Sequence, residues 1–218
     1  MRRTMEENRR NNPEFTFHLF NDAECRRYIH DHFEADVLEA YDRLIPGAFK
    51  ADLWRLCVMW REGGIYLDAK FSIRVPLREY VAGISGPWMV KDDWQPRQDQ
   101  TSPYQGILLA PPGHPVFLRG IRKIVENVAL RFYGFTCLEP TGPIMIANIL
   151  SAEERATFFH FQMKPTEGFL HEVYDTATNT LYFSETRGYR LDQNMDMLKF
   201  GNQEHYTHAW KHRRVYKE

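Results

Sequence analysis

Three charged side chains that could bind a polar ligand stand close together near the middle of the first half of the chain. Asp52 and Arg55 are three residues apart, so they share one face of a helix that we expect over residues 49–62. Asp68 ends an apolar run over residues 65–68 that is suited to a central strand. In open α/β sheets, ligands bind outside the carboxyl ends of strands. The segment can therefore present two carboxylates and a guanidinium to one ligand.

The expected helix over residues 49–62 has its own apolar stripe, which includes Leu53, Leu56 and Trp60. Gly63 follows it and suits a left-handed C-terminal cap. An ordinary structural explanation exists for Asp52 and Arg55, because an ion pair at this spacing on a solvated helix face contributes only about 0.2–0.5 kcal/mol.

Alternating helix and strand signals predict an α/β domain around this segment. We expect helices over residues 1–12, 22–33, 36–44, 115–132 and 143–150. We expect short strands over residues 15–20, 71–75, 87–92, 106–110, 158–163 and 180–183. The polar stretch over residues 93–104 carries no such signal, and a loop of this length in a compact domain is usually functional or disordered.

The composition excludes several functional classes. The chain has 218 residues, 43% of them hydrophobic, with 28 Lys and Arg against 29 Asp and Glu, for a net charge of −1. A dedicated nucleic-acid binder is usually basic. No apolar run approaches the ~20 residues of a membrane span, and the N-terminus has no apolar signal segment. Three scattered cysteines form neither a disulfide framework nor a zinc motif. We expect a soluble, cytoplasmic protein.

Two linked motifs resemble a known enzyme family. They are Ala51-Asp52-Leu53-Trp54-Arg55 and Gly63-Gly64-Ile65-Tyr66-Leu67-Asp68-Ala69-Lys70. Together they resemble the sugar-binding region containing a D-x-D motif of glycosyltransferase family 32, and the stretch from Cys137 to Pro143 is similar to capsular-polysaccharide and viral members. The resemblance implies the type A, Rossmann-like nucleotide-diphospho-sugar transferase fold, in a single domain over residues 1–218.

The resemblance assigns roles to residues of the motifs. Asp52 and Arg55 match donor-sugar contacts: Asp52 would accept hydrogen bonds from sugar hydroxyls, and Arg55 would reach a phosphate or sugar oxygen. Asp68 matches the first Asp of the D-x-D motif, close to the donor. Gly64 and Tyr66 are further donor-binding candidates, and Tyr66 either stacks on the nucleobase or packs in the core.

Lys70 stands where the family has the second Asp, which mainly binds a divalent cation such as Mn²⁺ or Mg²⁺. A lysine cannot ligate such an ion. Three hypotheses follow. Lys70 itself neutralises the diphosphate in catalysis, or Asp68 holds the metal with help from His205 in the C-terminal tail, or activity is lost.

Weaker candidates for the donor pocket lie further along the chain. Gln105 and Gly106 follow the long polar loop, where such folds approach the reacting centre. Thr141 and Gly142 could line the pocket, although Thr141 is equally suited to a helix N-cap. The resemblance also implies that the tail over residues 188–218 closes on the site.

Family members usually begin with a strand of the type Ile-Pro-Lys-Ile-Ile-His-Gln-x-Trp that cradles the nucleotide. This chain begins in the helix after it, so we expect the fold to lack the usual first strand and to expose a sheet edge.

The sequence therefore predicts a retaining glycosyltransferase that moves a sugar from a nucleotide-diphosphate sugar to a glycan or protein acceptor. One alternative is an inactive nucleotide-sugar-binding remnant, which Lys70 and the absent first strand favour. Another is a glycoside hydrolase with paired carboxylates. Only Asp52 is placed by the sequence to act as a second acid beside Asp68.

Overall fold

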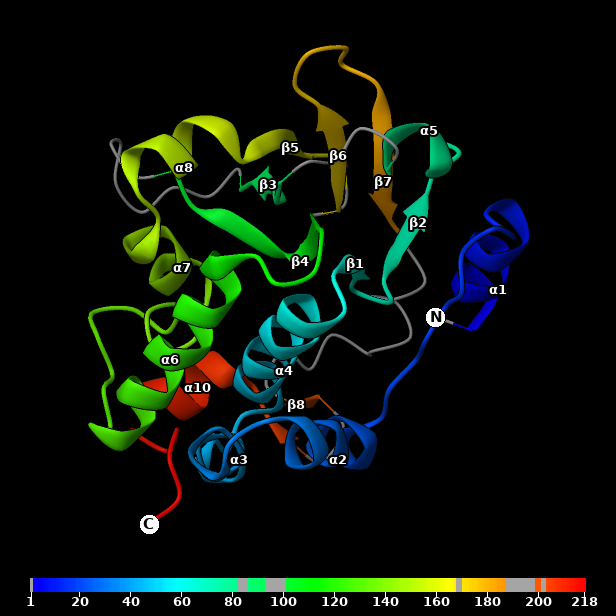
Figure 1. The fold of residues 1–218 in the computed structure, drawn as a ribbon. Coiled ribbons are helices and arrows are strands. Elements are labelled where there is room, and N and C mark those ends of the chain that lie inside the picture. The colour runs from blue at the N-terminus through cyan, green and yellow to red at the C-terminus, as the bar shows by residue number, and fades with distance from the viewer. Residues whose placement is uncertain (1, 82–85, 93–100, 168–169, 187–198, 201–202) are drawn as a thin grey trace. The chain divides into compact units, whose positions relative to one another are not determined.

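The structure of the protein, a computed structural model, describes residues 2–81, 86–92, 101–167, 170–186, 199–200 and 203–218 (Figure 1). It divides into two compact units. The sheet unit comprises Met1–His18, Gly64–Pro111 and Ser151–Met195, and the helical unit comprises Leu19–Gly63, Pro112–Leu150 and Asp196–Glu218. The chain crosses between them several times, and the single domain expected from the sequence stays a prediction.

The sheet unit is built on seven strands in the order β1-β4-β3-β5-β6-β7-β2. Their bounds are β1 Gly64–Leu67, β2 Phe71–Ile73, β3 Trp88–Lys91, β4 Pro103–Ala110, β5 Phe159–Pro165, β6 His171–Asp175 and β7 Leu181–Glu185. The pair β3–β5 is parallel, whereas the other five neighbouring pairs are antiparallel. The mixed α/β class expected from the sequence is confirmed, with a sheet that is mostly antiparallel.

Strand β1 does not lie in the middle of the sheet, as its apolar sequence suggested. It stands at the end of the described strand order and pairs with β4. Its side chains are exposed or half-buried, which fits an end position. The register places Leu67 opposite Ile107, and the Asp68 backbone N donates to the Gly106 carbonyl at 2.8 Å. This register decides what surrounds the Asp68 carboxylate.

A cluster of buried aromatic and aliphatic side chains from several strands forms the core of the sheet unit, including Phe71, Phe161, Tyr182 and Phe183. The short helices α5 (Arg78–Val81) and α8 (Ala152–Thr157) complete this unit together with α1 (Arg2–Asn11). Figure 1 shows α1 beside β2. We expected a strand over residues 15–20, and this is wrong: no strand forms there, and Phe15 and Phe17 pack against the core.

The helical unit contains α2 (Asp22–His32), α3 (Ala35–Arg43), α4 (Gly47–Arg61), α6 (Pro115–Ala129), α7 (Pro143–Ile149) and α10 (Tyr206–Lys211). Two short strands, β8 (Lys199–Phe200) and β9 (Gln203–Glu204), pair with each other. Helices α4 and α6 pack closely (Figure 1). A Cβ added to Gly120 of α6 would lie 2.9 Å from Leu56 Cδ1, so the glycine allows this close approach.

The helix boundaries agree well with the sequence signals. Asn21 caps α2 through a capping box with Glu24. Gly63 and Gly64 both have positive φ, at 65° and 82°, and together turn the chain from α4 into β1. Within the described ranges, no helix is long and apolar enough to cross a membrane. Most of the expected polar loop, residues 93–100, lies outside those ranges.

Candidate functional site

Asp52 and Arg55 form a buried polar cluster with Thr141 in the helical unit. Asp52 and Arg55 are each only 8% exposed, and Thr141 is fully buried. Arg55 Nη2 lies 3.4 Å from Asp52 Oδ1, and the Thr141 hydroxyl donates to Asp52 Oδ2 at 2.7 Å. Arg55 also donates from Nε to the Ala51 carbonyl. The sequence alone allowed a solvent-exposed ion pair, and this alternative is wrong because both residues are buried. Arg55 and Thr141 together hold the Asp52 carboxylate in place.

The loop before α7 brings Thr141 to Asp52. Asn127 of α6 donates from Nδ2 to the Pro140 carbonyl at 2.9 Å, which fixes this loop against α6. The N-cap residue of α7 is Gly142, not Thr141, and Pro143 takes the first helical position. A Cβ at Gly142 would lie 3.0 Å from the Leu138 carbonyl oxygen. The Thr141 hydroxyl therefore donates to Asp52 and does not cap α7.

Asp68 is the centre of a second cluster, in the sheet unit. It lies directly after β1, and its Oδ1 accepts a hydrogen bond from the Tyr66 hydroxyl at 2.8 Å. The Tyr104 hydroxyl of β4 lies 3.4 Å from Oδ2. Tyr66 is half-buried, and its hydroxyl orients the carboxylate that follows it. The sequence suggested base stacking or core packing for Tyr66. It did not predict the hydrogen bond from Tyr66 to Asp68.

Gly106 makes room for the Asp68 carboxylate. A Cβ at position 106 would lie 2.6 Å from Asp68 Oδ2 and 2.6 Å from the Tyr104 hydroxyl. Real Cβ atoms do not approach other atoms so closely. Gln105 precedes it on β4 and is 3% exposed, so it belongs to a buried strand and not to a loop. The structure therefore brings Gly106 together with Asp68, as part of one cluster.

Lys70 forms an ion pair with a residue that the sequence did not single out. Its Nζ lies 2.5 Å from Glu185 Oε1, with the lysine side chain 20% exposed and the glutamate side chain 3% exposed. Glu185 also accepts from His171, at 2.9 Å from the backbone N and 3.0 Å from Nδ1. The pairing of β2 with β7 places Phe71 opposite Glu185 and so delivers the carboxylate to Lys70.

The partners of Glu185 set its protonation state. Burial by itself raises the pKa of this carboxyl group, but the hydrogen bond from His171 and the charge of Lys70 outweigh burial and lower the pKa to about 2. Glu185 is therefore a carboxylate at neutral pH, and it neutralises the Lys70 ammonium. Sequence reasoning missed both Glu185 and His171, because only the strand register brings them to Lys70.

His205 belongs to the helical unit, where it is the N-cap residue of α10. Its Nδ1 lies 2.7 Å from the Thr207 hydroxyl. Burial lowers its pKa, which favours the neutral imidazole that metal ions bind. Across the described part of the chain, no three His, Cys, Asp or Glu side chains gather into a group that could hold a metal ion. Asp68 and His205 lie in different units, so their shared metal site stays a prediction.

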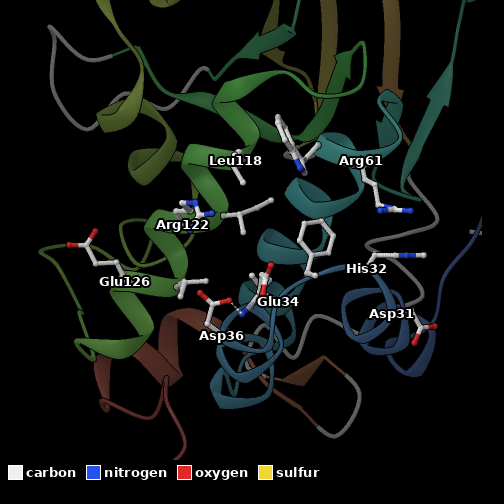
Figure 2. Close-up of a pocket in the computed structure, with 13 residues that line it drawn as sticks. Asp31, His32, Glu34, Asp36, Arg61, Leu118, Arg122 and Glu126 are labelled. Atoms are coloured by element: carbon white, nitrogen blue, oxygen red, sulfur yellow. Dashed lines mark hydrogen bonds between the residues drawn. The ribbon is translucent and has the colours of Figure 1, made fainter.

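A pocket of about 640 Å³ opens in the helical unit between α2, α3, α4 and α6 (Figure 2). Phe33, Val37, Leu118 and Ile121 give it an apolar lining. The labelled side chains in Figure 2 include the charged residues Asp31, Glu34, Asp36, Arg61, Arg122 and Glu126. None of the residues expected to bind a donor lines this pocket.

The segment that contains the two motifs matches a known family model. Residues 1–90 match the family model described as a glycosyltransferase sugar-binding region containing a DXD motif. The match spans Asp52, Arg55, Gly64, Tyr66 and the Asp68-Ala69-Lys70 segment, in which lysine replaces the second Asp of the DXD motif. It confirms the resemblance and agrees with a type A nucleotide-sugar transferase fold.

Two relatives carry glycosyltransferase names. An Acanthamoeba polyphaga mimivirus protein named uncharacterized glycosyltransferase L373 is 28% identical over 117 residues, which are 54% of this chain and 43% of that protein. A Saccharomyces cerevisiae protein that carries the name glycosyltransferase HOC1 is 23% identical over 134 residues, 55% of this chain and 34% of that protein. The chain thus spans less than half of either relative in these matches.

The family usually uses a divalent cation, and the residues at the motif do not fit one in the usual way. Asp68 supplies one carboxylate, but Lys70 repels a cation, and its ammonium is paired with Glu185. Where the second Asp would offer a carboxylate to the metal, this chain has an ammonium group that is paired with Glu185.

Proposed function

We propose that this chain transfers a sugar, with retention of configuration, from a nucleotide-diphosphate sugar to a glycan or protein acceptor. The observation that carries the proposal is the family match over residues 1–90. Two carboxylates in the matched segment, Asp52 and Asp68, already accept hydrogen bonds from neighbouring side chains. Pre-positioned groups lose little conformational entropy when a ligand binds, so they suit both recognition and catalysis.

The proposed roles follow from the chemistry of each cluster. Asp52, held by Thr141, accepts hydrogen bonds from donor-sugar hydroxyls, and Arg55 binds a donor oxygen with its planar guanidinium. Asp68, oriented by Tyr66, acts close to the sugar–phosphate bond. Gly64, Gln105, Gly106 and Gly142 contribute backbone close to the donor.

The charge that grows on the leaving diphosphate needs a positive partner. The pairing of Lys70 with Glu185 weakens the hypothesis that Lys70 alone supplies this charge, because the carboxylate already neutralises it. We propose that a divalent cation, Mn²⁺ or Mg²⁺, bound through Asp68 would supply this charge.

An assay of sugar release and transfer tests the function. The full chain is incubated with UDP- and GDP-sugars and a manno- or gluco-oligosaccharide acceptor, with and without manganese. We expect turnover that falls by roughly a hundredfold or more in Asp68→Asn, because the variant loses charge at the reacting centre. The control Glu153→Gln removes an exposed carboxylate of α8 and should retain full activity. Equal turnover in Asp68→Asn would refute the assignment of Asp68.

A specific observation favours a second candidate, a nucleotide-sugar-binding remnant without activity. It is the replacement of the metal-binding Asp by Lys70, together with its ion pair to Glu185. A remnant would be stabilised by a nucleotide sugar in a thermal-shift assay and yet release no sugar under any metal condition. Turnover that depends on Asp68 excludes it.

A further inference from the structure

An exposed apolar surface stands at the C-terminal end of α6, in the helical unit. Leu130 is 69% exposed, Phe132 is 39% exposed and Phe135 is 88% exposed, all within six consecutive residues. Ile45, at 42%, is a fourth exposed apolar residue of this unit. We call these four residues the apolar surface. Isolated exposed apolar residues are ordinary, but a group of them marks an interaction site.

The backbone holds the three side chains outward. Arg131 has a φ of 50° and Gly134 a φ of 64°, and this left-handed conformation is uncommon for an arginine. Tyr133, between the exposed residues, is only 8% exposed. Trp210 of α10 donates from Nε1 to the Tyr133 carbonyl at 2.7 Å. The loop is therefore anchored through Tyr133 while its neighbours stay in solvent.

The C-terminal segment joins Ile45 to the same surface. The Ile45 backbone N donates to the Val215 carbonyl at 2.8 Å, and the Tyr216 hydroxyl donates to the Phe132 carbonyl. The Tyr133 and Tyr216 rings pack edge to face at 5.3 Å. Figure 1 shows the C-terminal segment beside the end of α6. Ile45 and Phe132 thus flank one short, well-anchored stretch of chain.

The C-terminal segment that contacts the apolar surface is basic. The last eight residues contain four exposed basic residues, Lys211, Arg213, Arg214 and Lys217, against the single acidic Glu218. Arg213 is tied to the loop, because its guanidinium lies 4.1 Å above the Tyr133 ring. Exposed Arg131 adds a further charge. Glu139, an acidic residue close by in the chain, accepts a hydrogen bond from the Phe135 backbone N. The whole chain has a net charge of −1, so this excess is local.

We propose that the apolar surface and its basic neighbours dock this chain on an anionic lipid bilayer. Phe135, Leu130 and Phe132 enter the boundary between headgroups and acyl chains, and the arginines and lysines pair with lipid phosphates. Exposed Phe and Leu beside Lys and Arg are typical of proteins that lie on a membrane. Protein–protein interfaces are instead depleted in lysine. The docking is independent of the proposed sugar transfer.

Sedimentation with vesicles tests the proposal. The full chain is mixed with vesicles of phosphatidylcholine alone, and with vesicles that contain about 30% phosphatidylserine to supply a negative surface potential. We expect binding to the anionic vesicles that falls as salt is raised, because salt screens charge. Phe135→Ser should weaken that binding by roughly tenfold, since it removes a large apolar side chain from the bilayer.

Matched variants separate the two contributions. Leu19→Ser removes an apolar side chain that is 63% exposed and precedes α2 by three residues. Figure 1 draws the start of α2 and the end of α6 on opposite sides of the view. Leu19→Ser should bind vesicles as the parent chain does. Lys211→Gln with Lys217→Gln should weaken anionic binding by about fivefold for each lost charge. All four positions are exposed, so the fold should be kept.

Several results would overturn the proposal. It is wrong if the parent chain stays in the supernatant with anionic vesicles, or if Phe135→Ser sediments like the parent chain. Sedimentation velocity without lipid provides a further check. If the parent chain forms a dimer that binds no vesicles, and if Phe135→Ser abolishes that dimer, the apolar surface joins two copies of the chain and the proposal is wrong.

Discussion

At the scale of single residues, the candidate site depends on how each carboxylate is partnered. Asp52 receives the Thr141 hydroxyl, Asp68 receives the Tyr66 hydroxyl, and Glu185 receives Lys70 and His171. The first two carboxylates were expected from the motif, and the third was not. Each arrangement leads to a substitution whose effect can be measured.

Gly106→Ala should destabilise the protein and displace the Asp68 carboxylate. The added methyl group would lie 2.6 Å from Asp68 Oδ2, and crowding of this kind typically costs about 1–3 kcal/mol. Urea unfolding measures the loss. Gly86→Ala is the matched control, because a Cβ there meets no atom within 4 Å. Equal stability of the two variants would contradict the crowding.

Glu185 should make the stability of the protein depend on pH in the acid range. Its pKa in the folded state is about 2, below the value near 4.3 of an unperturbed glutamate. Its stabilising contribution is therefore complete above about pH 4.3 and is lost as the pH falls toward 2. The difference between the unfolding free energies of the parent chain and Glu185→Gln should be constant near pH 6 and shrink steadily as the pH falls from about 4.3 to 2. Glu153→Gln serves as an exposed control. A constant difference across this range would argue against the ion pair.

At the scale of elements, the helices were easier to predict than the strands. The bounds of α2 and α4 follow from local signals, a capping box at Asn21 and a glycine pair after Arg61. Strand β6 was not predicted, and the stretch over residues 15–20 was wrongly predicted as a strand. A short apolar run becomes a strand only if another strand pairs with it, and that depends on distant parts of the chain.

Helix α1 forms hydrogen bonds to the backbone of β2, at the end of the strand order, through the side-chain amide of Asn8. Asn8 donates from Nδ2 to the Phe71 carbonyl at 2.9 Å and accepts from the Ile73 backbone N at 2.9 Å, as a neighbouring strand would. Asn8→Ala leaves two buried backbone groups without these partners and should cost about 2–4 kcal/mol. Arg3→Ala in the same helix breaks an exposed ion pair and should change stability by less than ~0.5 kcal/mol. Chemical denaturation compares the two variants.

At the scale of the whole molecule, a donor should stabilise the folded chain. A nucleoside diphosphate at about 100 times its Kd adds about 2.7 kcal/mol to the free energy of unfolding. We expect UDP or GDP to raise the Tm, and the larger rise to occur with manganese if Asp68 takes part in a metal site. A screen in which no nucleoside diphosphate shifts the Tm would contradict donor binding by this chain.

A double variant tests what Lys70 replaces. Lys70→Asp combined with Glu185→Gln restores the D-x-D motif without placing two carboxylates side by side. Lys70 occupies the position of a metal-binding Asp, so this variant should show a larger manganese-dependent rise in Tm with UDP or GDP than the parent chain does. Glu185→Gln alone is the control. An unchanged response to manganese would contradict this expectation.

The sequence by itself determined the resemblance of residues 1–90 to a glycosyltransferase sugar-binding region, the amphipathic helix α4 and the position of Asp68 after an apolar strand. These are local properties, written in residues that are close together in the chain. Only the tertiary structure decided that Glu185 meets Lys70 and that Thr141 meets Asp52, across 115 and 89 residues. Such contacts depend on strand register and loop closure, which many distant residues determine together.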